Sequence, residues 1–241
     1  MEIDTSAGSA VNAFAVVFAR GGSKGIPRKN LRELSGHPLL YYSIRVGQET
    51  PGVADVFVST EDAEIAAVAE SLGAQVINRP RELATDTSAE WDAWQHAARV
   101  LMDHVGGDFT FVSLPPTSPL RRTEDVARCL DALTPEVDLV LTATTTHRNP
   151  WFNMVQRGEE GFVRTVLNPP TTISRRQDAP EVFDLGTVAY VSRASHIIRA
   201  EGLWDGKVSA VIVPPETAVD IDTEFDLMFA QLLIENSHPR K

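Results

Sequence analysis

Seven short apolar runs alternate along the chain with segments of helical periodicity. Each run is almost continuously apolar, as strands are when both faces of their sheet are covered. The runs occupy residues 14–19, 53–58, 75–77, 109–114, 139–143, 187–191 and 208–213.

Helical spacing of apolar residues predicts helices between these runs. The predicted helices cover residues 38–47, 62–72, 89–105, 124–133 and 224–236. Because strands alternate with helices, we predict an α/β fold with a mainly parallel sheet and helices on both of its faces. The helix predicted over residues 89–105 has apolar residues at helical spacing. We predict that they pack in the core rather than stack on a nucleotide base: Trp91, Trp94, Ala98, Leu101 and Val105.

The length of 241 residues suits one large domain. We expect that domain over residues 13–241, preceded by a flexible N-terminal tail over residues 1–12 that is small and polar. Residues 145–180 break the alternation with prolines, arginines and short apolar pieces. A segment this long is seldom structureless, so we expect a small excursion that packs on something else, with a partner subunit as a good candidate.

Composition excludes several classes of protein. Apolar residues make up 43% and charged residues 23%, which is typical of a folded globular chain. No apolar stretch approaches the roughly 20 residues that span a bilayer, and the start has no basic region followed by a long apolar core. The single cysteine, Cys129, fits a reducing interior, so a cytoplasmic location is expected. A net charge of -11 argues against general nucleic-acid binding.

This acidic chain nevertheless has one strongly basic segment. No Asp or Glu lies between Thr5 and Arg32, while five cations fall there: Arg20, Lys24, Arg28, Lys29 and Arg32. Charge alone leaves two readings open, a solvated basic face or a pocket for a small polyanion.

The basic segment follows the first predicted strand directly, as the string Arg20-Gly21-Gly22-Ser23-Lys24-Gly25-Ile26-Pro27-Arg28-Lys29-Asn30. Glycines there allow a sharp turn that aims backbone N–H groups at an anion, and the cations match phosphate oxygens. In open α/β sheets, ligands bind at the carboxyl ends of strands. The string matches neither GxxxxGK[ST] nor GxGxxG, which disfavours ordinary NTPases and nicotinamide-dependent oxidoreductases.

This string resembles the nucleotide-binding signature of the acylneuraminate cytidylyltransferase (CMP-sialic acid synthetase) family. The resemblance extends from Phe14 almost to the end of the chain and recurs in family order. Its further pieces are Val58-Ser59-Thr60-Glu61-Asp62, Asn78-Arg79-Pro80 followed by Asp86-Thr87, Pro116-Thr117-Ser118-Pro119-Leu120-Arg121, Arg175-Arg176-Gln177-Asp178 and Asp220-Ile221-Asp222-Thr223.

The resemblance implies a mainly parallel Rossmann-like nucleotidyltransferase sheet, one cytidylyltransferase domain, CTP as substrate, Mg²⁺ as cofactor and a homodimer. It also implies roles for individual residues. The triphosphate would be held by Arg20, Ser23 and Lys24, with Lys29 adding charge and with Gly21 and Gly22 as further nucleotide-binding residues. The cytidine would be contacted by Asn30 and Arg79, and a small acidic acceptor would be bound by Arg175, Arg176 and Gln177. The catalytic residues would be Arg20, Lys24, Asp220 and Asp222.

Asp220 and Asp222 also suggest a metal site on their own. Residues i and i+2 of an extended segment point to one face, so two carboxylates can converge on a hard cation. The alternative is that Asp222 or Thr223 only caps the helix predicted from Glu224, because both residue types are good N-caps.

The implied reaction needs no protein nucleophile. An acceptor oxygen attacks the α-phosphorus and pyrophosphate leaves, so catalysis depends on alignment and on neutralisation of charge. A non-catalytic nucleotide sensor on the same fold is the main rival, and the presence of both the basic loop and the two aspartates argues against it.

The acceptor is expected to be an acid other than N-acetylneuraminate. Pro115 stands where sialic-acid-using members commonly have the glutamine of Gln-Pro-Thr-Ser-Pro, and Asp184 lies in a segment where they have Asn-Gly or Arg-Pro-Asn-Gly. Loss of such partners changes the preferred substrate. Candidates are another 2-keto-3-deoxy sugar acid, or a small phosphonate such as phosphonoformate clamped by Arg175 and Arg176. Alternatively, both arginines are ordinary surface residues.

Overall fold

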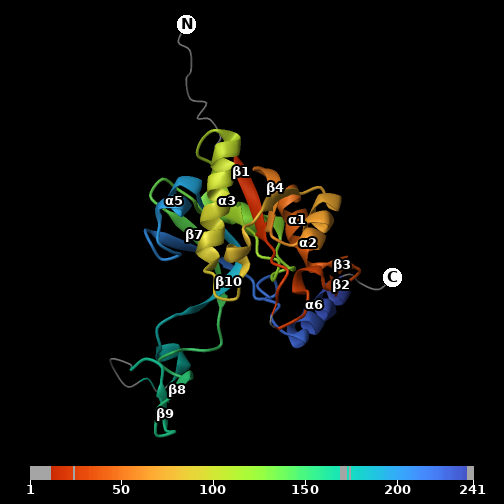
Figure 1. Ribbon diagram of the computed structural model, residues 1–241. Helices are drawn as coiled ribbons and strands as arrows, with labels where there is room; N and C mark the ends of the chain where they lie inside the picture. The colour runs from red at the N-terminus through yellow and green to blue at the C-terminus, as the bar shows by residue number, and fades with distance from the viewer. Residues whose placement is uncertain (1–11, 24, 169–172, 174, 238–241) are drawn as a thin grey trace.

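The computed structural model describes residues 12–23, 25–168, 173 and 175–237, and these form one central sheet with helices packed on it (Figure 1). Its order is β11-β7-β10-β6-β1-β4-β5, and only β10 runs antiparallel to its neighbours. The strands are β1 Ala13–Phe18, β4 Val53–Thr60, β5 Gln75–Asn78, β6 Thr110–Ser113, β7 Leu139–Thr145, β10 Phe183–Arg193 and β11 Val208–Val213. The predicted mainly parallel α/β fold is confirmed.

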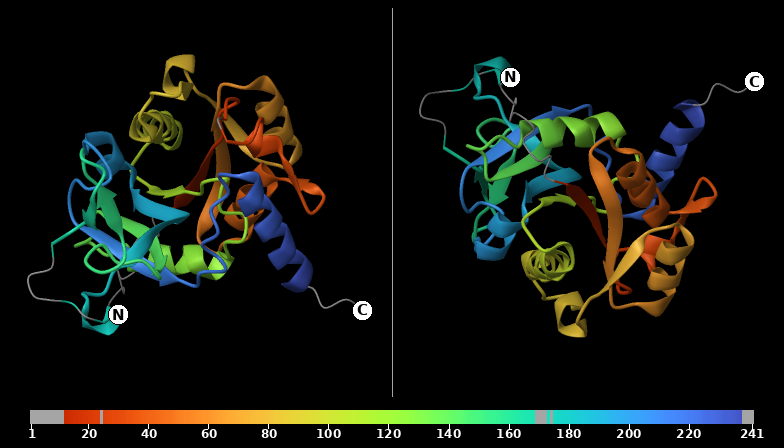
Figure 2. Two further views of the ribbon diagram at one scale, coloured as in Figure 1. Left: turned by 90° about the horizontal axis from the view of Figure 1, so that it is seen from below. Right: turned by 90° about the horizontal axis from the view of Figure 1, so that it is seen from above.

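Helices cover both faces of the sheet, and Figure 2 shows α3 on one side and α4 on the other. The α-helices are α1 Leu39–Glu49, α2 Ala63–Ser71, α3 Glu90–Val105, α4 Thr123–Ala132, α5 Ala194–Arg199 and α6 Glu224–Ser237. In the described part of the chain, three short 3-10 helices are η1 Lys29–Leu31, η2 Arg81–Ala84 and η3 Arg176–Asp178.

The near-continuous apolar character of β1 follows from this double covering. Ala15 and Val17 pack in the core beneath α1, α2 and α4, whereas Phe14 and Val16 pack in the core beneath α3 and α5. On α3, Trp94 is buried as predicted, but Val105 is 38% exposed because it ends the helix. Cys129 is a buried core residue, and burial raises the pKa of its thiol to about 12.

A third, smaller core joins the two ends of the chain. Strands β2 Glu33–Leu34 and β3 His37–Pro38 form a hairpin that packs on α6. Ile26 after the first strand, Leu34 of the hairpin, Ile221 and Leu227 share this core. Residues nearly 200 positions apart in sequence are therefore held together at the carboxyl edge of the sheet.

The segment expected as an excursion leaves the sheet after β7 and returns as β10. It contains a two-stranded hairpin of β8 Val155–Arg157 and β9 Val163–Thr165, followed by η3. Figure 1 shows this hairpin projecting away from the sheet, at the lower left. Below, "the excursion" means the described part of residues 146–182. The tail predicted over residues 1–12 lies outside the described residues except for Asn12.

Helix α5 and the β2–β3 hairpin were not predicted, and β10 is longer than the predicted run. The outer part of β10 includes exposed Asp184 and Leu185, so it lacks the continuous apolar character of a central strand. None of the helices in the described part of the chain has the length and apolarity that crossing a membrane requires.

Candidate active site

A cavity of about 340 Å³ lies where β1 and β6 end and β10 bends. It adjoins a second cavity of about 290 Å³, and Phe18, Arg20 and Glu90 line both. The first is also lined by Gly22, Ser23, Gly25, Lys29, Asn30, Pro115, Pro116, Thr117, Thr187, Tyr190 and Asp222; the second by Arg79, Leu83, Thr85, Asp86, Ser88, Ala89 and Ala93. The position at the carboxyl ends of the strands is where α/β sheets bind ligands.

The loop after β1 is tied to several other elements. Nη1 of Arg20 donates to the Thr85 carbonyl at 3.0 Å and lies 2.9 Å from an Asp86 carboxylate oxygen. Asn30 is buried, and its amide donates to the Arg20 carbonyl at 2.9 Å. The backbone N–H of Gly21 donates to Oε1 of Glu61 at 2.8 Å. The described part of the loop therefore holds a fixed shape, with Arg20 and Lys29 at the cavity.

The same loop contacts the segment that contains the two aspartates. A Cβ placed on Gly25 would lie 2.2 Å from the carbonyl oxygen of Asp222, so no other residue fits there without displacing one of the two backbones. Nζ of Lys29 donates to the Ile221 carbonyl at 2.9 Å and to Oδ1 of Asp222 at 3.0 Å. The basic loop and the aspartates thus form one interlocked unit.

Among the predicted nucleotide residues, Arg20, Gly22, Ser23, Lys29 and Asn30 line the first cavity. Arg79 lines the second, and Gly21 lies behind the loop against Glu61 and Asp62. Lys24 lies outside the described residues.

Arg28 and Asp62 brace the far side of the loop. Arg28 has a left-handed backbone with a φ of 55°, and its guanidinium donates to Asp62 at 2.6 Å. Asp62 also accepts from the N–H groups of Glu64 and Ile65, which makes it the N-cap of α2. The hydrogen bond from Arg28, followed by those from the helix backbone, lowers the pKa of Asp62 to about 2.

Asp220 and Asp222 are both exposed, and Ile221 between them is fully buried. The two carboxylates therefore lie on the solvent side of one extended segment, which the N–H of Ile221 anchors to the Thr117 carbonyl at 2.8 Å. Their oxygens are the ligands that Mg²⁺ prefers, and two carboxylates suit an ion that also takes water and phosphate ligands.

The cap of α6 is made by other residues. Thr223 accepts from the N–H of Asp226 at 3.3 Å, and the Asp226 carboxylate accepts from the N–H of Thr223 at 2.7 Å. The alternative that Thr223 caps the helix beginning at Glu224 is therefore correct. The carboxylate of Asp222 instead forms an ion pair with Lys29.

Arg79 and Glu90 face the second cavity with opposite charges. Arg79 is buried and donates to Oε2 of Glu61 at 3.2 Å, and burial lowers the pKa of its guanidinium. Desolvation by the surrounding protein raises the pKa of Glu90, against the hydrogen bond from Trp94 and the charge of Arg79. The Asp220 charge also acts on Glu90, so these groups lie within electrostatic range of one another.

A buried arginine shapes the other wall of the first cavity. Arg121 donates to Ser43 Oγ at 2.5 Å, to the Thr187 carbonyl at 3.3 Å and to the Pro115 carbonyl. Burial lowers the pKa of Arg121 to about 9, which still leaves it protonated at neutral pH. It therefore fixes two residues that line the cavity, Pro115 and Thr187.

Thr187 reaches the cavity because β10 bulges. The register passes from Gly186 opposite Thr142 to Tyr190 opposite Leu141, which leaves three residues of β10 unpaired. The hydroxyl of Thr187 lies 2.6 Å from that of Ser118. Tyr190 closes the wall, and burial raises the pKa of its phenol to about 12, so the phenol stays neutral.

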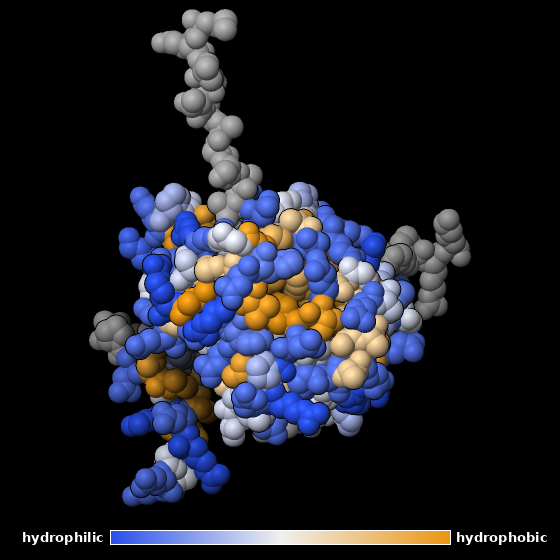
Figure 3. All heavy atoms as spheres, turned by 45° about the horizontal axis from the view of Figure 1, so that its top comes forward, coloured by the Kyte–Doolittle hydropathy of each residue, from blue (hydrophilic) through white to orange (hydrophobic). Residues whose placement is uncertain are grey.

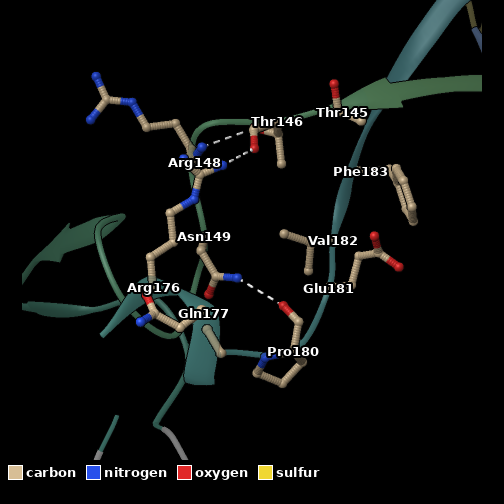
Figure 4. Close-up of a pocket in the computed structure, with 11 residues that line it drawn as sticks. Thr145, Thr146, Arg148, Asn149, Arg176, Gln177, Pro180, Glu181, Val182 and Phe183 are labelled. Carbon is tan, nitrogen blue, oxygen red and sulfur yellow. Dashed lines mark hydrogen bonds between the residues drawn. The ribbon is translucent and has the colours of Figure 1, made fainter. Parts of the chain in front are cut away.

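The predicted acceptor residues lie elsewhere, on the excursion. Arg175 pairs with its neighbour Asp178 at 2.9 Å. Arg176 donates to the Thr146 carbonyl at 2.7 Å and, with Gln177, lines a separate cavity of about 370 Å³ at the base of the excursion (Figure 4). Both arginines are exposed. Within one chain, these residues do not line the cavities at the basic loop.

Several residues at or behind the two cavities were given no role by the sequence. Glu61 and Asp62 bond to the loop and line neither cavity, and these contacts could not be predicted from their place in the string Val58-Ser59-Thr60-Glu61-Asp62. Glu90 begins a predicted helix, where an acidic residue is ordinary. Thr187 and Tyr190 enter through the bulge, for which the only sequence signal is Gly186.

Comparison with known proteins shows that this chain is similar to cytidylyltransferases and CMP-sugar acid synthases. Residues 14–147 match the model of the family described as Cytidylyltransferase. CMP-N,N'-diacetyllegionaminic acid synthase of Campylobacter jejuni is 29% identical over 221 residues, which are 90% of this chain and 93% of the relative. N-acylneuraminate cytidylyltransferase of Oncorhynchus mykiss is 32% identical over 219 residues, 90% of this chain and 49% of that protein.

A solved structure shares the fold over almost the whole chain. CMP:2-keto-3-deoxy-manno-octonic acid synthetase complexed with CTP superposes with a TM-score of 0.70 at 18% identity, covering 94% of this chain and 100% of that one.

Proposed function

The chain belongs to the cytidylyltransferase family and is a CTP-dependent nucleotidyltransferase, and from this premise we propose that it transfers CMP to a nonulosonate-like sugar acid. The observation that supports this most is the interlocked unit of the basic loop and the aspartate segment. A Cβ on Gly25 would meet the Asp222 carbonyl, so Arg20, Lys29 and Asp222 stand at fixed positions around one cavity.

The reaction is a single displacement at phosphorus. A hydroxyl oxygen of the acceptor forms a bond to the α-phosphorus of CTP, and the bond from that phosphorus to the bridging oxygen of the β-phosphate breaks. The electron pair leaves with pyrophosphate, and the hydroxyl proton is released. Arg20 and Lys29 at the cavity neutralise negative charge that grows on the leaving group.

We propose that Asp220 and Asp222 hold Mg²⁺ together with phosphate oxygens of CTP. The ion would neutralise phosphate charge. Lys29 keeps one oxygen of Asp222 in place at 3.0 Å, and Ile221 anchors the segment from below.

The acceptor is an acid other than N-acetylneuraminate in this proposal. Pro115 and Thr187 line the first cavity, and neither offers the side-chain amide that the resemblance associates with sialic acid. The name of the Campylobacter jejuni relative points to a diacetylated legionaminic acid as one acid of this class.

We also propose that two copies assemble through the excursion. Its apolar side chains are largely exposed, with Phe162 at 76% and Val155 and Val163 at 62% each. Apolar residues gather on it at the lower left of the space-filling view (Figure 3). Patches of this kind on a folded protein mark association surfaces. Of the residues named from the sequence, Met154 is 40% exposed, whereas Trp151 and Phe152 are half-buried.

Helix α6 offers a second apolar surface that the excursion of the other copy would cover. Phe225, Met228, Phe229 and Leu232 follow helical spacing and are between 45% and 76% exposed. Every charged side chain on α6 is acidic, whereas the excursion contains five arginines beside four acidic residues, Glu159, Glu160, Asp178 and Glu181. Because α6 begins two residues after Asp222, docking there would bring arginines of the second copy toward the nucleotide.

One experiment tests the proposed reaction. The pure protein is incubated with CTP, Mg²⁺ and, separately, N,N'-diacetyllegionaminic acid, N-acetylneuraminate, 2-keto-3-deoxy-manno-octonate and phosphonoformate, and pyrophosphate is measured. We expect release with a sugar acid other than N-acetylneuraminate. Preference for N-acetylneuraminate would overturn the acceptor assignment, and preference for phosphonoformate would replace it. Stabilisation by CTP without pyrophosphate from any acceptor would indicate a nucleotide sensor.

A further inference from the structure

Glu90 stands between the two cavities, and its surroundings suit a ligand rather than a salt bridge. It begins α3 and lines both cavities together with Phe18 and Arg20. Its Oε1 accepts a hydrogen bond from Nε1 of Trp94 at 3.2 Å. Within the described part of the chain, no protein group donates to its Oε2. One oxygen is therefore fixed by the protein, and the other is open to the cavities.

Trp94 makes this orientation rigid. Its side chain is 3% exposed and stacks on Phe18 with ring centroids 6.2 Å apart. Glu90 therefore rests at the edge of a fixed aromatic floor. Leu83, Ala89 and Ala93 add apolar walls to the second cavity, which suits a flat ring.

Arg79 supplies the opposite charge in the same cavity. It is 7% exposed, and its Nε is buried without a partner among the described residues. Its charge acts on Glu90, but no ion pair within 4.0 Å joins the two side chains there. A donor group and an acceptor group thus face a common space of about 290 Å³.

A cytosine ring presents the matching pattern along one edge. Its ring N3 and O2 accept hydrogen bonds, and its exocyclic 4-amino group donates, a group that Glu carboxylates recognise. Uracil differs at these positions: O4 accepts and N3–H donates. A carboxylate opposite O4 would leave two acceptors facing each other, so the hydrogen bond that cytosine makes there would be lost.

We propose that Glu90 accepts a hydrogen bond from the 4-amino group of the CTP base while Arg79 donates to the same edge, so that Glu90 sets the preference for CTP over UTP. This inference rests on the proposed function, because it places the base of CTP in the second cavity. It assigns a specificity role to a residue for which the sequence analysis gave none.

The test compares two nucleotides of equal size. The ratio of kcat/KM for CTP to that for UTP is measured for wild type, Glu90→Gln and Glu90→Ala. Glutamine keeps an oxygen for Trp94 and can offer an amide N–H to O4 of uracil. We expect the ratio to fall at least about tenfold in both variants, the scale of one lost base-specific contact. In Glu90→Gln, the UTP value should also rise.

Glu82→Gln is the control, because Glu82 is an exposed carboxylate of η2 that lines neither cavity. Its ratio should stay at the wild-type value. If Glu90→Gln lowered kcat/KM equally for CTP and UTP, the ratio would be unchanged and the proposal would be wrong, since Glu90 would then act at the reacting atoms. Thermal stabilisation by CTP and by UTP gives the same comparison without turnover.

Failure of this inference can be told from failure of the proposed function. If wild-type protein released no pyrophosphate with CTP and any acceptor, the proposed function would be wrong. The binding comparison would still decide the role of Glu90: equal stabilisation of wild type by CTP and UTP would overturn it.

Discussion

The two ends of the proposed reaction are built differently in this chain. At the nucleotide end, the loop after β1, the aspartate segment and the start of α2 bond to one another across as many as 193 residues of sequence. At the excursion, bonds stay within the segment itself: Arg175 pairs with Asp178, Arg176 with Thr146, and β8 with β9. Apolar side chains there remain exposed.

This contrast separates the region whose geometry is complete within one chain from the region that leaves a surface for another copy. The nucleotide end fixes its geometry within a single copy, as a site that stabilises charge by preorganisation must. The excursion leaves its apolar surface uncovered and its arginines away from the cavity. The nucleotide end should therefore respond to single changes in geometry, and the excursion to changes in assembly.

The largest effect is expected from Gly25→Ala. The new methyl would lie 2.2 Å from the Asp222 carbonyl, so the loop and the aspartates must separate. A displacement of about 1 Å at a reacting centre can cost about a hundredfold in rate. We expect a loss of at least about that size in kcat/KM, measured as pyrophosphate release. In the control Gly202→Ala the methyl meets open space, and activity should be unchanged.

One result with Gly25→Ala would contradict this expectation. Turnover of Gly25→Ala within a few-fold of wild type would show that the loop and the aspartate segment need not be interlocked.

A smaller effect is expected from the metal ligands. Asp220→Asn and Asp222→Asn should raise the Mg²⁺ concentration that gives half-maximal activity, because a neutral amide is a poorer ligand for a hard dication. Thr223→Ala, which removes the cap of α6, should lower the melting temperature and leave the Mg²⁺ requirement unchanged. The metal assignment fails if both Asn variants keep the wild-type requirement.

The excursion should respond through assembly. Phe162→Glu on the excursion and Phe225→Glu on α6 should each give monomers by sedimentation, because a buried charge without a partner opposes association. Thermal stabilisation by CTP should persist, while turnover with the acceptor falls at least about tenfold. Trp204→Glu is the control, since Trp204 is 69% exposed but lies between α5 and β11. If the wild-type protein sediments as a monomer, the proposed homodimer is wrong.

Sequence predicted the nucleotide end better than the excursion for a physical reason. Strands buried on both faces, such as β1, are continuously apolar, and the basic loop must follow such a strand directly. The outer part of β10 has no such signature because Asp184 and Leu185 are exposed. The bulge that brings Thr187 to the cavity depends on Thr142, 45 positions earlier, whose hydroxyl bonds to Gly186 and Ala189.

Other features depend on three-dimensional neighbours that no local pattern contains. An acidic residue at the start of a helix is ordinary, so Glu90 could not be distinguished before Trp94, Arg79 and the two cavities surrounded it. Arg121 lies in a string that the resemblance identified, yet its burial and its bonds to Ser43 and Thr187 could not be predicted.

The smallest expected effect concerns the brace between the nucleotide loop and α2. Asp62 caps α2 and accepts from Arg28, and its pKa is lowered from 3.8 to about 2. A lowered pKa in the folded state means that the stabilisation is fully present above about pH 4 and is lost as the pH falls toward 2. Asp62→Asn keeps a capping side chain but removes the charge, whereas Asp62→Ala removes both. At pH 7 we therefore expect Asp62→Ala to lower the free energy of unfolding by about 1 kcal/mol and Asp62→Asn by less. Urea unfolding at several pH values measures this, and the deficit of Asp62→Asn should shrink between pH 4 and pH 2; a deficit that stayed constant over that range would mean that the Arg28 charge does not stabilise the loop.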